Sequence, residues 1–292
     1  MKVSLLHNEK AGSSVTLNEI ADAIERHGHD IIAVVERHDD QDELLDPGSE
    51  LIVVAGGDGT IASAARVLAG QDQPPPLAIL PIGTANNIAS SLRIVGPLTE
   101  LVGRWDAARR MPLDIGVASG DWGRRYFVEA VGGGLIPAGI RMVQSRKADE
   151  HGDPSDKVER AQALFRDVLD TLEPSHLTID MDGTTLTGRF LLVEVLNIKS
   201  VGPNLDLCSD ANPSDGYFAV VVAAESDRSL VDDYLRHLAE SSEARLRLPV
   251  HRARKVTIQG LPAMHLDDRV VTLDESAAVS MTIIEGALEV LV

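Results

Sequence analysis

The chain has 292 residues, a formal net charge of −18 and an apolar content of 44%. This length allows two domains and a sizeable core. Nonspecific binding to nucleic acid and electrostatic docking on anionic lipid both need a basic surface, so the charge argues against both. A single cysteine, Cys208, excludes an intrachain disulfide and a metal site built from several cysteines.

No segment has the pattern of a membrane span or a signal peptide. The longest apolar runs, such as residues 190–193, fall far short of the about 20 residues that a membrane-spanning helix needs. The N-terminus becomes polar at His7-Asn8, which is too early for a signal-peptide core. We therefore expect a cytoplasmic protein.

The first third of the chain alternates strand and helix patterns. Thr16 and Glu19 form a capping-box sequence at the start of the first helix, and Gly28 is placed to end it. The next strand is followed by a polar, acidic loop over 36–50. This alternation predicts a parallel sheet with covered faces. The predicted strands are 2–6, 31–35, 51–55 and 77–80, and later helices are expected after the loop at 56–60, after residue 87, and from about 99 to 109.

After Pro112 strand patterns dominate, with two helices among them. Asp182-Gly183 at the centre of 177–187 is a strong signal for a two-residue hairpin turn. The pattern predicts an antiparallel sandwich or curved sheet. The expected strands are 126–131, 190–198, 217–224, 255–259, 270–273 and 279–284, and the expected helices are 156–172 and about 229–239.

Residues 56–60 read Gly-Gly-Asp-Gly-Thr and join a buried strand to a helix. Glycine lets the backbone approach an anion closely. The free amides and the dipole of a helix start favour negative charge. Asp58 by itself would repel phosphate, so we expect it to meet phosphate through a magnesium ion. The loop therefore predicts a polyphosphate site.

Two further loops of small and polar residues, 8–14 and 81–87, also follow strands. In open α/β sheets, ligands bind in the crevice at the carboxyl ends of the parallel strands. A single glycine-rich turn is often purely structural. Three such loops at one edge of a sheet favour a phosphate-binding site.

The segments 56–60 and 80–89 closely resemble the diacylglycerol kinase catalytic domain family, which includes bacterial lipid kinases, sphingosine kinases and ceramide kinases. Residues 8–12 are similar to the first nucleotide loop of that family. More loosely, 213–218 looks like its Asp-Gly segment before a sandwich strand, and 286–291 like its C-terminal strand. The resemblance spans nearly the whole chain and is strongest in the first third.

This resemblance implies an α/β nucleotide-binding domain over 1–112, joined by a C-terminal strand at about 286–292, and a β-sandwich domain over 113–285. It implies ATP and Mg²⁺ at the glycine loops, and a lipid that enters the interdomain cleft during a transient encounter at the inner membrane face. Metal contacts are implied for Asp58 and for Asp215, for which capping of a turn is the alternative. The implied nucleotide contacts are Asn8, Gly12, Gly56, Gly57, Asp58, Gly59, Thr60, Gly83, Thr84 and Asn86.

By the same resemblance, Asp267 is the catalytic base on a late hairpin. The family has Asp-Gly-Glu there, whereas this chain has Asp267-Asp268-Arg269. Arg269 would either pair with the base or bind phosphate. Two more departures are Asn87, where many members carry Asp, and Ile136-Pro137, which interrupts a Gly-x-Asp pattern.

Two other functions remain open. NAD kinases share the Gly-Gly-Asp-Gly-Thr loop, but their second loop is of the type Leu-Gly-Phe-Leu, whereas this chain has Gly-Thr-Ala-Asn-Asn. The change at Asp268-Arg269 motivates the second alternative, a regulatory protein that binds nucleotide without kinase turnover. The headgroup of the lipid and the oligomeric state leave no pattern in the sequence.

Overall fold

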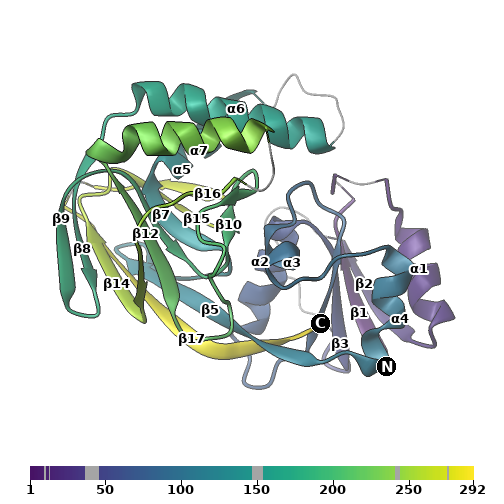
Figure 1. Ribbon diagram of the computed structural model, residues 1–292. Helices are drawn as coiled ribbons and strands as arrows, with labels where there is room; N and C mark the ends of the chain where they lie inside the picture. Colours follow the sequence, from purple (N-terminus) through teal and green to yellow (C-terminus); the bar gives the residue numbers. More distant parts are fainter. Residues whose placement is uncertain (10, 13, 37–45, 147–153, 241–243, 275) are drawn as a thin grey trace.

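The computed structural model describes residues 1–292 except 10, 13, 37–45, 147–153, 241–243 and 275. Most of the loop predicted over 36–50 therefore lies outside the described residues. Figure 1 shows two lobes side by side, with the N-terminal third of the chain in one and most of the remainder in the other. Both chain termini lie in the N-terminal lobe (Figure 1).

The N-terminal lobe contains a parallel sheet in the order β2-β1-β3-β4, which confirms the predicted α/β architecture. Every residue of β3 is buried, because helices cover both faces of the sheet. The strands are β1 (Lys2–His7), β2 (Asp30–Glu36), β3 (Leu51–Gly56) and β4 (Leu77–Pro81), and the helices are α1 (Leu17–Arg26), α2 (Asp58–Leu68), α3 (Asn87–Ser91) and α4 (Leu98–Gly103).

Both ends of α1 form as the sequence predicts. The Thr16 side chain accepts a hydrogen bond from the Glu19 amide, and the Glu19 carboxylate accepts one from the Thr16 amide. Gly28 follows the helix with a φ of 79°, in the left-handed region that glycine adopts without a steric cost.

The helix predicted over 99–109 is wrong in length. Helix α4 ends at Gly103, a 3₁₀ turn covers Trp105–Ala107, and strand β5 (Arg110–Gly120) begins directly afterwards. The backbone groups of Arg109 exchange hydrogen bonds with those of Val292. Pairing with the end of the chain therefore replaces the helical bonds that local sequence favoured.

The C-terminal lobe is a curved, mostly antiparallel sheet, as predicted, with α5, α6 and α7 packed over one face (Figure 1). The Asp182-Gly183 turn joins β8 to β9, and both residues have positive φ, at 50° and 89°. The remaining strands are β6 (Gly123–Phe127), β7 (Ala130–Gly134), β8 (Ser175–Met181), β9 (Thr184–Leu196), β10 (Ser200–Val201), β11 (Leu205–Asp206), β12 (Phe218–Ala224), β13 (Val250–Ala253), β14 (Lys255–Gln259), β15 (Ala263–Leu266), β16 (Arg269–Thr272) and β17 (Ala278–Leu291), and the helices are α5 (Leu135–Arg146), α6 (Pro154–Thr171) and α7 (Arg228–Glu240).

Strand β17 connects the two lobes. The separate strands predicted at 279–284 and 286–291 are one strand, whose register shifts between Ile284 and Leu288. Gly286 lies within this irregularity with a φ of 58°. Beyond it, Val290 pairs in parallel with Leu77 of β4, so one hydrogen-bonded sheet runs through both lobes.

A break in the predicted strand 126–131 matters for the site. The structure has two strands there, β6 and β7, and Val128 and Glu129 lie between them. Helix α5, which follows β7, was not predicted. Within the described residues, no helix combines the length and the apolar character needed to cross a bilayer.

Candidate active site

The two glycine loops of the N-terminal lobe touch through their backbones. A Cβ added to Gly83 would lie 2.3 Å from the Gly57 Cα atom and 3.0 Å from its amide nitrogen. Real Cβ atoms do not approach backbone this closely, so the loops at 56–60 and 81–87 are in contact only because residue 83 is glycine. This contact puts two of the predicted nucleotide residues side by side.

The first loop, at the end of β1, meets the same group. The Asn8 side-chain amide donates a hydrogen bond of 3.2 Å to the Thr60 hydroxyl. A Cβ on Gly12 would lie 2.5 Å from the Thr84 hydroxyl oxygen. All three predicted loops therefore gather at the carboxyl ends of β1, β3 and β4, the place where open α/β sheets bind ligands.

Asp58 uses one carboxylate oxygen to hold the start of α3. Its Oδ1 accepts a hydrogen bond of 2.9 Å from the Ile88 amide. Burial raises the pKa of Asp58, and backbone hydrogen bonds from residues 86–88 partly oppose this rise. No three Asp, Glu, His or Cys side chains in the described part of the chain gather to hold a metal ion. A magnesium ion at Asp58 would accordingly take most of its ligands from phosphate and water, which is the usual habit of this ion.

Two adjacent asparagines lock the second loop. Asn86 has a φ of 53° and its side chain bonds both the amide and the carbonyl of Gly83, at 3.0 and 2.9 Å. The Asn87 side-chain amide donates to the Gly202 carbonyl of the other lobe at 2.9 Å. An aspartate at position 87 has no donor for this bond, so the departure from the family pattern gives a contact between the lobes.

A cavity of about 540 Å³ opens beside these loops, between the lobes. Its lining includes four carboxylates, those of Asp58, Glu129, Asp267 and Asp268. Helices α5 and α6 contribute a mainly apolar part of the lining, which also includes Gln144 and Lys157. Its apolar side chains are Ile140, Val143, Val158, Ala161 and Phe165.

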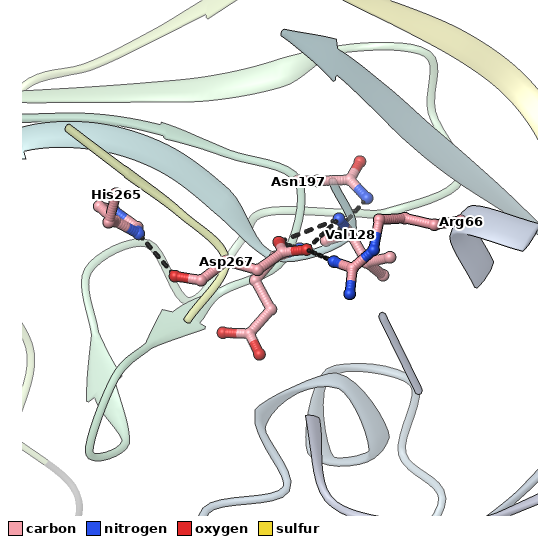
Figure 2. A network of polar contacts seen from close by, with 6 residues as sticks. Arg66, Val128, Asn197, His265 and Asp267 are labelled. Atoms are coloured by element: carbon pink, nitrogen blue, oxygen red, sulfur yellow. Dashed lines mark hydrogen bonds and ion pairs between the residues drawn. The ribbon is translucent and has the colours of Figure 1, made fainter. Parts of the chain in front are cut away.

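Asp267 lies in this cavity wall, in the turn between β15 and β16, with a φ of 50°. Its side chain is 1% exposed. The Oδ1 atom accepts hydrogen bonds from the amides of Glu129 at 2.8 Å and Val128 at 3.1 Å (Figure 2). Since these two amides turn toward the carboxylate, they cannot continue the strand predicted over 126–131. Burial raises the pKa of Asp267 to about 6, and the Glu129 amide and Arg66 oppose the rise.

The cation that pairs with Asp267 is Arg66, not Arg269. Arg66 extends from α2 of the N-terminal lobe and its Nη1 lies 3.3 Å from Asp267 Oδ2 (Figure 2). Arg269 is exposed at the start of β16, where it pairs with Leu266 across the two-residue turn. The arginine that pairs with Asp267 is therefore 201 positions away in the chain, and not Arg269, for which such a pairing was one of the alternatives.

Glu129 is a cavity residue that the sequence reasoning missed. The residue is 6% exposed, and it lines the same cavity as Asp267. Burial raises the pKa of Glu129 well above its ordinary value, and the nearby charge of Asp58 raises it further. One signal was available, since Glu129 is the only charged residue in the apolar run 126–131.

Asp215 lies apart from the gathered loops, in the turn before β12. Its Oδ2 accepts a hydrogen bond of 2.6 Å from Arg252, and its Oδ1 accepts one of 3.0 Å from the Tyr217 amide. These contacts are those of a turn-capping aspartate, the alternative considered from sequence. The cation site proposed at Asp215 stays a prediction.

The fold and the loops define a class of two-lobed kinases, and comparison with family models agrees. Residues 2–118 match the diacylglycerol kinase catalytic domain, and residues 134–292 match the YegS C-terminal NAD kinase beta sandwich-like domain. The chain therefore belongs to the diacylglycerol kinase and YegS-like family of lipid kinases.

Individual relatives are distant. A diacylglycerol kinase of Bacillus subtilis is 29% identical over 181 residues, which are 61% of this chain and 56% of that protein. A diacylglycerol kinase of Mycobacterium tuberculosis is 27% identical over 242 residues, 78% of this chain and 75% of that one. The crystal structure of a diacylglycerol kinase from Bacillus anthracis superposes with a TM-score of 0.71 at 18% identity and covers 99% of this chain and 96% of that chain. This last likeness concerns the fold alone.

Proposed function

We propose that the protein transfers the γ-phosphate of ATP to the hydroxyl of a lipid such as diacylglycerol. The observation that carries the proposal is the cavity beside the glycine loops. Its lining combines carboxylates with apolar side chains from two helices, which suits a hydroxyl group at the end of acyl chains. The names of the relatives support the same chemistry.

In this proposal the three loops hold the nucleotide. Asn8 bonds Thr60, Gly12 lies against Thr84, and the absence of side chains at Gly57 and Gly83 lets an anion approach the backbone. When bound, ATP would supply the phosphoryl group and Mg²⁺ would neutralise part of its negative charge. Phosphoryl transfer asks the protein mainly for positioning and for charge stabilisation.

Asp267 is the proposed base. Its Oδ2 accepts the proton of the lipid hydroxyl, while Oδ1 stays bonded to the two amides that fix the carboxylate. Burial in the cavity wall raises the pKa of Asp267 to about 6, which makes its carboxylate a better proton acceptor than an exposed aspartate. We propose that the protein is cytoplasmic and meets the inner face of the membrane only while it takes up lipid.

The test is incubation of the purified protein with labelled ATP, Mg²⁺ and vesicles that contain a mixed lipid extract. We expect a labelled lipid phosphate, identified by chromatography and mass spectrometry, and no product when ATP is omitted. Formation of labelled NADP from NAD in place of a lipid product would favour the NAD kinase alternative.

One observation favours the regulatory alternative. Both Asp267 oxygens accept hydrogen bonds, and the Arg66 ion pair reduces the basicity of this carboxylate. A nucleotide-binding protein without turnover would bind ATP with Mg²⁺ in the same assay and yield no labelled lipid.

The acid limb of the pH–rate profile should report Asp267. Its pKa is raised to about 6, so the ionised, active form increases as pH rises through that value. The Arg66 cation lowers this pKa, and replacement of Arg66 by methionine should therefore move the acid limb of kcat/KM to higher pH. Arg104→Met, which removes an exposed arginine paired with Glu100 in the same lobe, should leave the limb in place. An unchanged limb in Arg66→Met would contradict the role given to this ion pair.

A further inference from the structure

A buried pair of ionisable side chains lies behind the turn that carries Asp267. His265 Nε2 is 2.7 Å from Glu194 Oε2, and His265 Nδ1 is 2.9 Å from the Asp267 carbonyl oxygen. The two side chains are 1% and 0% exposed. Neither lines the cavity between the lobes. The mechanism proposed above uses neither of them.

The sheet is built to let the two side chains meet. Glu194 on β9 pairs with Gly132 on β7, and Gly132 pairs with His265 on β15, so the three residues form one row across three strands. A Cβ on Gly132 would lie 2.2 Å from the Glu194 carboxylate carbon. To reach His265, the Glu194 side chain therefore crosses over Gly132. This position must lack a side chain to leave room for it.

The hydrogen bonds of the His265 ring determine which ring nitrogen must be protonated. A carbonyl oxygen only accepts, so His265 Nδ1 must carry hydrogen and donate it to Asp267 (Figure 2). At Nε2 a single proton is shared with Glu194, and the pair is neutral overall whichever of the two holds it. Burial lowers the pKa of His265, but the Glu194 carboxylate and Asp267 together more than offset this, and the net shift of the pKa is upward.

The Asp267 turn needs such support. A non-glycine residue with a φ of 50° is strained, and the surrounding structure must hold it. The Asp267 amide donates a hydrogen bond to the Ala130 carbonyl, and its carboxylate accepts hydrogen bonds from the amides at 128 and 129. His265 donates a hydrogen bond to the Asp267 carbonyl. The other oxygen of Glu194, Oε1, has no hydrogen-bond partner within the described residues. An unsatisfied buried oxygen costs free energy of folding, and two apolar side chains in place of Glu194 and His265 would avoid that cost.

We propose that Glu194 and His265 are positioning residues for the kinase reaction, which hold the Asp267 turn through the Nδ1 hydrogen so that the carboxylate faces the cavity. This inference rests on the proposed function, in which Asp267 is the base. Glu194 orients the ring from behind, in the way that a carboxylate orients a catalytic histidine. Loss of the pair should therefore lower kcat and leave the KM for lipid and the affinity for ATP nearly unchanged.

Three variants separate positioning from packing. Glu194→Leu removes the partner of the ring, and we expect kcat to fall about tenfold or more. Glu194→Gln keeps a polar partner for Nε2 and should restore kcat to within about threefold of the parent protein. The control is Met264→Ala, which removes a fully buried side chain next to His265 that packs in the core on the other face of the sheet. It should lower the melting temperature without lowering kcat below the parent value at a temperature where it is folded.

A folded Glu194→Leu protein with the parent kcat would overturn the proposal, as would equal losses of kcat in Glu194→Leu and Glu194→Gln. A second measurement does not depend on turnover or on the stability of the variants. Nitrogen NMR of histidine-labelled parent protein should show the His265 Nδ1 atom protonated, with a slowly exchanging hydrogen. An unprotonated Nδ1 would overturn the proposal even in an active kinase. Absence of lipid phosphorylation with Nδ1 protonated would instead count against the proposed function.

Discussion

Replacement of Asp267 by asparagine is expected to lower kcat by about 10²–10⁴-fold, the usual contribution of a general base. Asparagine keeps an oxygen that can accept from the amides of Val128 and Glu129, so the turn should persist. It loses the ability to take a proton. Steady-state kinetics with the lipid that the labelling assay identifies would measure the loss, and calorimetry should show that ATP with Mg²⁺ still binds.

A matched control exists in the same lobe. Asp182 also has a φ of 50° in a hairpin turn, and its carboxylate also accepts hydrogen bonds from two backbone amides, those of Arg254 and Lys255. Asp182→Asn should leave kcat unchanged. If Asp267→Asn were folded and turned over at the parent rate, Asp267 would not be the base.

The second large effect is expected at the contact between the glycine loops. A Cβ at position 83 would lie 2.3 Å from the Gly57 Cα atom, and backbone cannot move aside as a side chain can. Gly83→Ala should therefore push the loops apart and weaken ATP binding by about tenfold or more, which corresponds to about 1.4 kcal/mol. Isothermal titration calorimetry with ATP and Mg²⁺ measures this change directly.

Gly70→Ala is the control for this substitution. Gly70 follows α2 in the same lobe, and a Cβ there would meet only the Val67 carbonyl, at an ordinary contact distance of 3.6 Å. Its ATP affinity should match that of the parent protein. Parent affinity in a folded Gly83→Ala protein would mean that the nucleotide does not depend on the contact of these two loops.

The features that the sequence predicted correctly depend on short-range patterns. Apolar runs and helical periodicity set the order of strands and helices in the first third, and Thr16, Glu19 and Gly28 mark the ends of α1 through bonds between neighbours. The dominant strand patterns after Pro112 and the Asp182-Gly183 turn predict the antiparallel C-terminal lobe. The three loops could be placed at one edge because parallel strands bring their carboxyl ends together.

The features that the sequence did not predict depend on residues distant in the chain. The amides of Val128 and Glu129 donate hydrogen bonds to Asp267, which lies 139 and 138 positions later in the chain. These bonds interrupt a segment whose local sequence predicts one continuous strand. The helix predicted over 99–109 ends at Gly103, because Arg109 and the strand that follows it pair with the other end of the chain. Local propensity favours neither outcome, since the partners are absent from the local segment.

The sequence by itself therefore determined the fold class, the family and the three loops that form the proposed nucleotide site. Only the tertiary structure decided what surrounds Asp267. Asp267 forms an ion pair with Arg66 and not with Arg269, which is two positions away in the sequence. Glu129 lines the same cavity, and Glu194 and His265 lie behind the turn. Charge and hydrogen bonding act over a few ångströms in space, and a single sequence does not state which distant residues come that close.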